Sequence, residues 1–489
     1  MKISFEALLE QAGLGRAVAS DSRAVTPGCV FVAVRGAAED GSRYIPAALD
    51  GGATAIVADA TCSAETVAQV EAAGAALALV EDTRLAISAL AAAHYRTASL
   101  GMTIIGVTGT NGKTTCAYLL ERLFQSLGHT VGVMGTVSYR WPGHTEAAPL
   151  TTPGPLAVHA NLAAMAQAGC DVCVMEVSSH SLDQKRVQHV PFAGACFTNL
   201  TQDHLDFHGD LETYFQAKAH LFTDVPSPAK AVATNADDAH GAQIARMVPG
   251  TVTYGFAGCP EGCDPSRHLH GDLLEQGTSG VRLRMTFGDA SWEMRSPLIG
   301  RFNADNLLTV QAMALAMGVA PSSLQALASF RGVPGRLERV DNARGLHVFV
   351  DYAHTPDALV NVLQAVRGAG FRRVVCVFGC GGNRDRGKRP LMAEAVASLA
   401  DVAVLTSDNP RFEDPTEIIR DVLPGLASAR AIIVDADRFC ATRRACELTG
   451  PEDCLVIAGK GHEDYQIIGG VKHHYSDQEV VRQILGLAE

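Results

Sequence analysis

The stretch Met102-Thr-Ile-Ile-Gly-Val-Thr-Gly-Thr-Asn-Gly-Lys-Thr-Thr115 decides the fold: an apolar run, a glycine-rich turn and then the helical period of residues 116–124. This order predicts a strand, a phosphate-binding turn and a helix, because glycines let backbone N–H groups approach a phosphate and a helix N-terminus adds positive potential. Lys113 would reach the terminal phosphates of a nucleotide, and Thr114 would offer its hydroxyl to Mg²⁺. The match to G-x-x-x-x-G-K-[ST] is imperfect, since Val107 occupies the first glycine position.

Two further apolar runs end in residues that suit a metal site. Glu176 closes the run 171–177, and the run 196–200 opens into a polar segment with Asp203 and His204. Ligands gather at the carboxyl edge of a parallel sheet, so a carboxylate there can hold Mg²⁺ opposite the phosphate loop. By themselves, these residues favour a structural role for His204 and leave the role of Glu176 undecided.

The same alternation of apolar run, turn and helical period recurs along the chain and predicts α/β domains with mainly parallel sheets. We expect three domains: residues 1–93, a central parallel-sheet domain of the P-loop ATPase type at 94–331, and a Rossmann-like domain at 332–489. Residues 258–271 look like an excursion loop. The clearest predicted strands lie at residues 102–107, 172–177, 195–198, 348–351, 374–379, 402–405, 431–434 and 454–458.

Composition limits the function. With 489 residues, 47% of them apolar and 19% charged, the chain can bury substantial cores. Its 40 Lys and Arg against 52 Asp and Glu give a net charge of −12, which argues against general binding to nucleic acid or anionic membranes. The 13 scattered cysteines suit a reducing cytosol. Glu6 and Glu10 interrupt any signal-peptide pattern, and no apolar run is long enough for a membrane span, so we expect a cytoplasmic protein without membrane insertion.

Several motifs in a fixed order resemble the Mur ligase family, the ATP-dependent amino-acid ligases of peptidoglycan precursor synthesis. The resemblance spans all three predicted domains, and Val107 fits the family's form of the phosphate loop. Two motifs, at residues 21–23 and 408–411, point within the family to the members that add meso-diaminopimelate. The other motifs lie at residues 108–114, 175–180, 199–204, 214–218, 300–303, 306, 335–338, 351–356 and 459–463.

The resemblance implies roles for individual residues. Lys113, Glu176, His204 and Lys218 would be catalytic, and Thr114, Glu176, His204 and a carbamylated Lys218 would surround Mg²⁺. ATP would contact Gly109, Thr110, Asn111, Gly112, Lys113, Thr114, Thr115, Asn306, Arg336, Asp351 and His354. The nucleotide-sugar dipeptide would contact Ser22, Thr151, Thr152, Ser178, Gln184 and Arg186. The amino acid would contact Arg384, Asp408, Asn409, Pro410, Arg411, Gly459 and Glu463.

The activity that the resemblance implies is the ligation of meso-diaminopimelate to the D-glutamate γ-carboxylate of UDP-N-acetylmuramoyl-L-alanyl-D-glutamate, a step in cell-wall growth and hence in cell shape and division. A carboxylate condenses with an amine only after activation, because its oxygen is a poor leaving group. Phosphorylation by ATP would give an acyl phosphate, with charge neutralised by Lys113 and by Mg²⁺. The expected partners are small molecules, not nucleic acid, and the expected state is a monomer.

Three other interpretations are weighed against this one. A lysine-adding relative differs only in the amino-acid pocket, and the choice depends on Arg411. A ligase like folylpolyglutamate synthetase shares the phosphate loop, but residues 21–23 and 408–411 disfavour it. A P-loop ATPase switch, a different class of protein, needs no amino-acid pocket and would turn over ATP without an acceptor.

Overall fold

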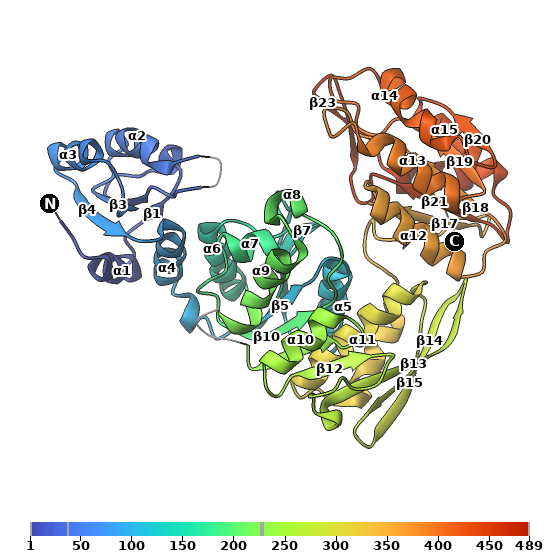
Figure 1. The fold of residues 1–489 in the computed structure, drawn as a ribbon, viewed down its shortest axis with the longest axis horizontal. Coiled ribbons are helices and arrows are strands. Elements are labelled where there is room, and N and C mark those ends of the chain that lie inside the picture. The colour runs from blue at the N-terminus through green and yellow to red at the C-terminus, as the bar shows by residue number, and fades with distance from the viewer. Residues whose placement is uncertain (1, 37–38, 225–228, 488–489) are drawn as a thin grey trace. The chain divides into compact units, whose positions relative to one another are not determined.

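The computed structural model of the chain describes residues 2–36, 39–224 and 229–487 (Figure 1). It divides into two compact units. Residues 1–270, 287–289 and 308–324 form the first unit, and residues 271–286, 290–307 and 325–489 form the second. Within the described ranges, no helix combines the length and the apolar character that crossing a membrane requires.

The first unit begins with a small four-stranded sheet in the order β1-β2-β3-β4, with all three pairings parallel. Successive residues of β2 face opposite sides: Val30 and Val32 pack with α1 and α4, and Phe31 packs with α2 and α3. Both faces are therefore buried, which is why the strands read as continuous apolar runs. The elements are β1 (Val18–Ala19), β2 (Val30–Val32), β3 (Ala55–Asp59), β4 (Ala76–Val80), α1 (Phe5–Gly13), α2 (Ile45–Asp50), α3 (Ala64–Ala72), α4 (Thr83–His94) and 3₁₀ turns at Ser22–Ala24, Gly41–Tyr44 and Thr97–Ser99.

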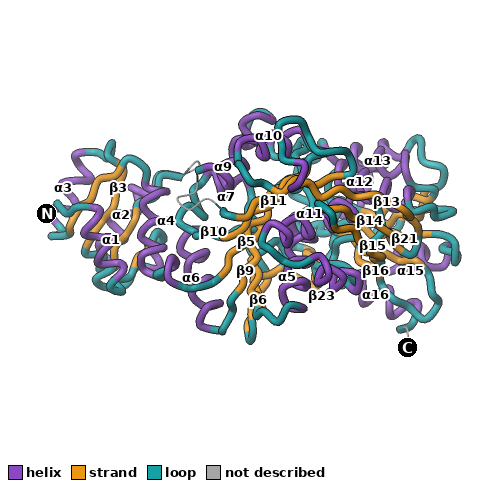
Figure 2. The backbone as a smooth tube through the Cα atoms, turned by 90° about the horizontal axis from the view of Figure 1, so that it is seen from below, coloured by secondary structure: helices purple, strands orange, loops and turns teal. Residues whose placement is uncertain are grey.

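A larger, eleven-stranded sheet follows in the order β15-β14-β13-β12-β11-β10-β5-β9-β6-β7-β8, and its part in the first unit runs from residues 268–270 of β13 to β8. The strands from β13 to β6 pair in parallel, and β7 and β8 add antiparallel strands at the end. Figure 2 shows β11, β10, β5, β9 and β6 side by side with helices around them. The strands are β5 (Thr103–Thr108), β6 (Val131–Met134), β7 (Ser138–Trp141), β8 (His144–Ala147), β9 (Val172–Glu176), β10 (Phe192–Phe197), β11 (Ala231–Asn235), β12 (Val252–Gly255) and β13 (His268–Gly277).

Register brings the predicted site residues to one edge of this sheet. Val107 of β5 lies opposite Glu176 of β9, and Thr108 lies opposite Phe197 of β10, so three strands end together. Helix α5 follows β5 and packs on β5, β6 and β9. The helices of this part are α5 (Lys113–Ser126), α6 (Pro155–Gln167), α7 (Ser179–Asp183), α8 (Leu205–His208), α9 (Leu211–Thr223), α10 (Ala239–Met247) and the 3₁₀ turn Pro265–Arg267.

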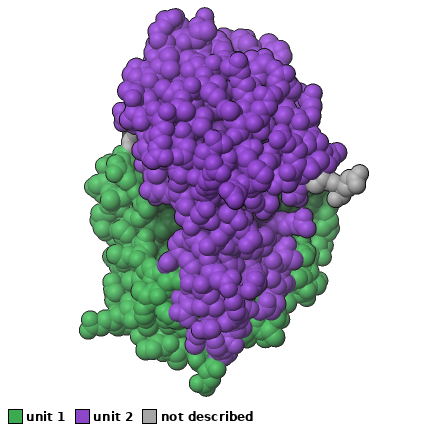
Figure 3. Space-filling model, turned by 90° about the vertical axis from the view of Figure 1, so that its right-hand side faces the viewer, with its two compact units in different colours: residues 1–270, 287–289, 308–324 green, residues 271–286, 290–307, 325–489 purple. Residues whose placement is uncertain are grey.

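The second unit, purple in Figure 3, contains a six-stranded sheet in the order β16-β17-β21-β18-β19-β20. All its pairings are parallel except that of β16. On β18, Val374, Cys376 and Phe378 pack with α12, α13 and α14, while Val375 and Val377 pack with α15 and α16. The strands are β16 (Glu338–Arg339), β17 (His347–Asp351), β18 (Val374–Phe378), β19 (Val402–Leu405), β20 (Ile432–Val434), β21 (Cys454–Ala458) and the hairpin β22 (Tyr465–Ile468) and β23 (Val471–His474).

The helices of this sheet are α12 (Pro356–Gly368), α13 (Lys388–Leu399), α14 (Pro415–Val422), α15 (Arg438–Leu448), α16 (Asp477–Leu485) and the 3₁₀ turn Leu423–Leu426. Between β13 and β16 the chain also forms β14 (Gly280–Phe287), β15 (Ala290–Ser296) and the 3₁₀ segment Pro321–Ser329. Helix α11 (Arg301–Ala316) has residues in both units.

The predicted strands are confirmed to within a few residues, but the predicted loop at 258–271 is partly wrong. Strand β13 already begins at His268 and runs to Gly277. Sequence analysis also did not identify the antiparallel strands β7 and β8. Their alternating patterns include charged and polar residues, such as His144 and Glu146, which give a weak strand signal.

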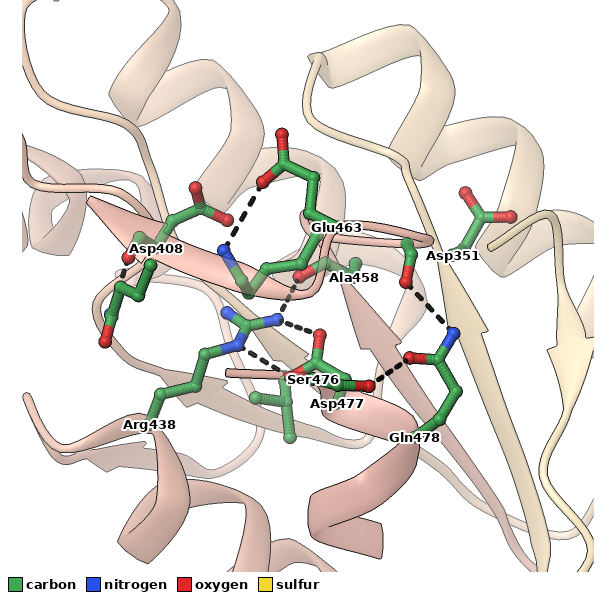
Figure 4. A network of polar contacts seen from close by, with 12 residues as sticks. Asp351, Asp408, Arg438, Ala458, Glu463, Ser476, Asp477 and Gln478 are labelled. Atoms are coloured by element: carbon green, nitrogen blue, oxygen red, sulfur yellow. Dashed lines mark hydrogen bonds and ion pairs between the residues drawn. The ribbon is translucent and has the colours of Figure 1, made fainter. Parts of the chain in front are cut away.

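A buried ion pair joins two helices of the second unit at the end of β21 (Figure 4). Arg438 donates from Nε and a terminal nitrogen to the two carboxylate oxygens of Asp477, both at 2.8 Å, and both side chains are 0% exposed. Arg438 also donates to the carbonyl oxygen of Ala458 at 2.9 Å, where β21 ends. The pair therefore anchors α15, α16 and the end of β21 to one another.

We expect Asp477→Ala to destabilise the second unit by roughly 3–5 kcal/mol, because it leaves the buried Arg438 charge uncompensated. Hydrogen exchange of β21 peptides, measured by mass spectrometry, should show the loss of protection. The control is Glu417→Ala, which removes an exposed pair with Arg420 in the same unit and should cost less than about 1 kcal/mol. Similar protection of β21 in both variants would contradict this account.

Candidate functional site

The glycine-rich turn connects β5 to α5 and is built around glycines that other residues cannot replace. Gly109 has φ +144°, and a Cβ there would lie 1.9 Å from Thr198 Oγ1. Gly112, at φ +86°, is the N-cap of α5. Thr110 N donates to the carbonyl oxygen of Asn199 at 2.8 Å, and Asn111 N donates to Asn199 Oδ1 at 3.0 Å. The segment after β10 therefore fixes the shape of the turn.

Lys113 lies in the first turn of α5 and bends back over the glycine-rich turn. Its Nζ donates to the carbonyl oxygens of Gly109 at 2.9 Å and Thr110 at 2.8 Å. An ammonium group thus lies beside a helix N-terminus of a 14-residue helix, and both favour an anion. This is the arrangement that the sequence predicts for a phosphate-binding loop.

Glu176 ends β9 with its carboxylate 1% exposed and tied to the phosphate loop. Glu176 Oε2 accepts from Thr114 Oγ1 at 3.0 Å and from Thr136 Oγ1 at 2.9 Å, while Oε1 accepts from Thr136 N at 2.9 Å. A Cβ on Gly135 would lie 2.3 Å from Oε1, so a side chain there would displace this carboxylate. A carboxylate and a hydroxyl side by side are hard oxygen donors, and these residues therefore fit Mg²⁺.

Lys218 lies on α9 and reaches the same turn. It is 1% exposed, its Nζ donates to the carbonyl oxygen of Gly109 at 2.8 Å, and the nitrogen lies 4.4 Å from the centre of the Tyr214 ring. Burial lowers the pKa of the Lys218 ammonium well below its usual value, and the nearby Lys113 charge lowers it further. The structure thus brings Lys218 and Lys113 to one carbonyl oxygen.

His204 contacts His180 and Asp203 rather than the Glu176 carboxylate. It has φ +53°, and its ring lies 4.7 Å from the ring of His180, with Nε2 3.5 Å from a carboxylate oxygen of Asp203. Among the residues that the structure describes, no group of three His, Cys, Asp or Glu side chains is placed to hold a metal ion. The metal ligand set stays a prediction.

The predicted nucleotide-sugar contacts form a connected group next to Glu176, with one exception. Thr152 Oγ1 donates to the carbonyl oxygen of Glu176 at 2.8 Å and accepts from Ser178 N at 3.1 Å. Arg186 donates to the carbonyl oxygen of Thr152 at 2.7 Å and to Gln184 Oε1 at 2.7 Å. Thr151 Oγ1 lies 3.1 Å from Thr136 Oγ1. Ser22 lies far along the chain, in the 3₁₀ turn after β1.

The remaining predicted nucleotide contacts lie in the second unit, where three of the four gather at the end of β17. Asp351 accepts from Leu337 N at 2.6 Å and Ala353 N at 2.7 Å, and burial nevertheless raises the pKa of its carboxyl group. Arg336 lies over the Tyr352 ring, 5.2 Å from its centre. His354 Nδ1 lies 2.7 Å from the carbonyl oxygen of Tyr352, and burial lowers the pKa of this imidazole. Asn306 lies on α11 and donates to Asn303 Oδ1 at 3.2 Å.

The predicted amino-acid contacts come together where β18, β19 and β21 end. Asn409 Nδ2 donates to Glu463 Oε2 at 2.9 Å, which joins the loop after β19 to the loop after β21. Gly459 has φ +116°, and a Cβ there would lie 2.5 Å from Asp408 Oδ2. Arg411 donates to the carbonyl oxygen of Gly382 at 2.8 Å, which joins these loops to the loop after β18, where Arg384 lies. Figure 4 shows Asp408 and Glu463 above the Arg438 pair.

Sequence reasoning missed several residues that shape these sites. Thr136 contacts Glu176 through both its N–H and its hydroxyl, yet no motif marks it. Lys460, within the quoted 459–463 motif, is fully buried and donates to Asn409 Oδ1 at 3.2 Å and Glu463 Oε2 at 3.3 Å. A buried cation between two predicted contact residues could have been suspected from that motif.

Comparisons with known proteins agree along the whole chain. Residues 16–95 match the "Mur ligase family, catalytic domain", residues 107–314 the "Mur ligase middle domain", and residues 335–461 the "Mur ligase, glutamate ligase domain". A relative from Lawsonia intracellularis, named UDP-N-acetylmuramoyl-L-alanyl-D-glutamate--2,6-diaminopimelate ligase, is 52% identical over 467 residues, covering 95% of each chain. The chain belongs to the Mur ligase family.

Other Mur ligases support the same conclusion. A relative of the same name from Synechococcus elongatus is 44% identical over 96% of this chain and 93% of its own. A solved structure of a UDP-N-acetylmuramoyl-L-alanyl-D-glutamate--2,6-diaminopimelate ligase is 34% identical, with a TM-score of 0.69 over 96% of this chain and 94% of its own. A MurF ligase from Thermotoga maritima in complex with ADP shares the fold at 19% identity, with a TM-score of 0.57 over 97% of this chain and 98% of its own. The predicted α/β fold class is thereby confirmed.

Proposed function

We propose that this Mur ligase uses ATP and Mg²⁺ to join meso-diaminopimelate to the γ-carboxylate of D-glutamate in UDP-N-acetylmuramoyl-L-alanyl-D-glutamate. The 52% identity to a 2,6-diaminopimelate ligase over nearly the whole chain carries the proposal. The loop of Gly109–Lys113 beside Glu176 in the first unit and the Asp408–Arg411 loop in the second support it, because a ligase needs both a phosphate site and an amine site. We place the reaction in the cytoplasm, with a monomeric enzyme and only small molecules as partners.

The first unit supplies the groups for activating the carboxylate. ATP bound with Mg²⁺ supplies the phosphoryl group that turns the γ-carboxylate into an acyl phosphate. Lys113 and the N-terminus of α5 place positive charge where the phosphate oxygens gain negative charge in the transition state. Thr114 and Glu176 would hold the metal from the buried edge of the sheet, and the Thr136 hydrogen bonds keep the Glu176 carboxylate in place.

The second unit supplies the groups that select the nucleophile. meso-Diaminopimelate and L-lysine differ by one carboxylate at the far end of the side chain. Arg411 donates to Gly382 with one terminal nitrogen, and the rest of its planar guanidinium can face a carboxylate. Glu463 would accept from the neighbouring ammonium, while Lys460 and Asn409 hold its Oε2.

The first prediction from this function concerns coupling: ATP hydrolysis should require the nucleotide-sugar dipeptide, and product should require the amine as well. Lys113→Ala should lower turnover at least ~100-fold without unfolding the chain, because it removes charge at the transferring phosphate. The measurement is phosphate release with each substrate added or left out. Rapid ATP turnover by the purified protein without an acceptor would instead favour a P-loop ATPase switch.

The second prediction concerns selectivity: meso-diaminopimelate should be preferred over L-lysine by about 30- to 1,000-fold in kcat/KM, because lysine leaves Arg411 without its anion. Arg411→Ala should reduce this preference towards unity. The matched control is Arg420→Ala, which removes an exposed arginine on α14 in the same unit. An unchanged ratio of the two kcat/KM values in Arg411→Ala would show that the pocket has been assigned to the wrong residue.

The third prediction concerns Lys218, which we expect to carry a carbamate. Only an uncharged amine attacks CO₂, and burial lowers the Lys218 pKa, so the uncharged form is more abundant than for an exposed lysine. The new N–C bond gives an anion with two oxygen acceptors and releases one proton from the nitrogen. Such an anion suits a hard metal better than an ammonium does.

Chemical rescue tests the carbamate. Lys218→Ala should be nearly inactive and should regain activity with added short-chain carboxylates, which can occupy the vacated anionic position. Lys230→Ala, a substitution of an exposed lysine in the same unit, should keep its activity and should not respond to carboxylates. Near-normal activity of Lys218→Ala without any carboxylate would mean that the side chain is not a metal-site anion.

A further inference from the structure

A buried arginine lies beneath the two loops that carry Arg384 and Arg411. Arg389 is in the first turn of α13 and its side chain is 0% exposed. One terminal nitrogen donates to both carboxylate oxygens of Glu413, at 2.9 and 3.0 Å, and the other donates to an oxygen of Asp421 at 2.7 Å. Neither Arg389 nor Glu413 belongs to the set of residues assigned to substrates above.

Glu413 connects Arg389 to the loop that carries Arg384. Its Oε1 accepts a short hydrogen bond from Asn383 N, one residue before Arg384. That hydrogen bond and the Arg389 charge hold the pKa of the Glu413 carboxyl below its usual value, so the group is ionised and stays paired. Asn383 has φ +52°, a left-handed conformation that costs free energy and persists only where neighbours enforce it.

The same contacts fix the second loop. Asn383 Oδ1 accepts from Phe412 N at 3.1 Å, and Gly382 N donates to the carbonyl oxygen of Asn409 at 2.9 Å. Between these two contacts lies Arg411, which has φ +54° and donates to the carbonyl oxygen of Gly382 at 2.8 Å. A Cβ on Gly382 would lie 2.0 Å from the carbonyl oxygen of Pro410, so the two backbones touch.

We propose that Arg389 and Glu413 are positioning residues for amino-acid selection: through Asn383 they hold the Arg411 guanidinium where it can meet the distal carboxylate of the amine substrate. The inference rests on the proposed function and deepens it, because it assigns the orientation of Arg411 to an ion pair between the buried Arg389 and the half-buried Glu413. Bidentate recognition by a planar guanidinium depends on orientation, and a displacement of about 1 Å at a reacting or binding group can cost up to ~100-fold.

A matched control separates a positioning role of the Arg389–Glu413 ion pair from a general contribution to stability. Arg386 donates to the same Asp421, at 3.0 and 2.7 Å, but its side chain is 65% exposed and it makes no hydrogen bond to Glu413 within the described residues. Arg386→Met therefore removes an ion pair beside α13 and leaves the Glu413–Asn383 contact in place.

The experiment compares Glu413→Ala, Glu413→Gln and Arg386→Met in the full-length enzyme. The measured quantity is the ratio of kcat/KM for meso-diaminopimelate to that for L-lysine, which does not depend on the fraction of correctly folded enzyme. The KM values for ATP and for the nucleotide-sugar dipeptide are measured alongside. Glu413→Gln keeps one oxygen for Asn383 N but loses the charge and one acceptor oxygen facing Arg389, so it remains informative if Glu413→Ala folds poorly.

We expect Glu413→Ala to lower the ratio roughly tenfold or more, mainly through a higher KM for meso-diaminopimelate, with a smaller fall in Glu413→Gln and unchanged KM values for the other two substrates. Arg386→Met should stay within about twofold of the wild type. A fall of less than roughly threefold in both Glu413 variants, or an equal fall in Arg386→Met, overturns the inference. The wild type is assayed first: if it forms no product that depends on meso-diaminopimelate, the proposed function itself fails, whereas a selective wild type with unaltered Glu413 variants counts against the positioning role alone.

Discussion

The parallel pairing of β5 with β9 on one side and β10 on the other is the constraint on which the first unit's site depends. Because Val107 lies opposite Glu176 and Thr108 opposite Phe197, the glycine-rich turn, the Glu176 carboxylate and the Thr198–Asn199 segment emerge at one edge. The carbonyl oxygen of Gly109 then accepts from two lysines, Lys113 at 2.9 Å and Lys218 at 2.8 Å. One backbone oxygen thus brings together the lysine of the phosphate loop and the buried lysine that we expect to carry a carbamate.

The second unit also gathers its candidate site residues where parallel strands end together. Loops after β18, β19 and β21 meet at one edge of a parallel sheet. Buried arginine and lysine side chains bind residues of these loops or of the strand ends. Arg438 joins Asp477 to the end of β21, Lys460 joins Asn409 to Glu463, and Arg389 joins Glu413 to the loop after β18. A buried charge is costly without a partner, so each cation restricts the loop conformations to those that keep its pair together. The proposed selectivity for the amine substrate would then depend on such anchoring as well as on the residues expected to touch the substrate.

Much of this architecture could be predicted from local pattern. Strands of the parallel sheets are apolar on both faces, so runs such as residues 402–405 and 454–458 were located to the residue. The antiparallel strands β7 and β8 and the start of β13 were missed, since polar residues, buried in β7 and β13 and exposed in β8, interrupt their apolar signal. The family resemblance implied a role for Asn409, Arg411 and Glu463, and the fold joins their loops to one another and to the loop after β18, while their contact with the amino acid stays a prediction.

By itself, the sequence determined the α/β class, the phosphate turn around Lys113 and the family to which the chain is similar. Each of these can be recognised from short runs of residues that are adjacent in the sequence. Only the tertiary structure decided that Thr136 holds Glu176, that Lys218 shares an acceptor with Lys113, and that Arg389 reaches Glu413 beneath the Arg411 loop. These contacts join residues that are 24 to 109 positions apart in the sequence, and no motif specifies that separation. Their partners are chosen by strand register and by the need to pair every buried charge, and those two conditions exist only once the chain has folded.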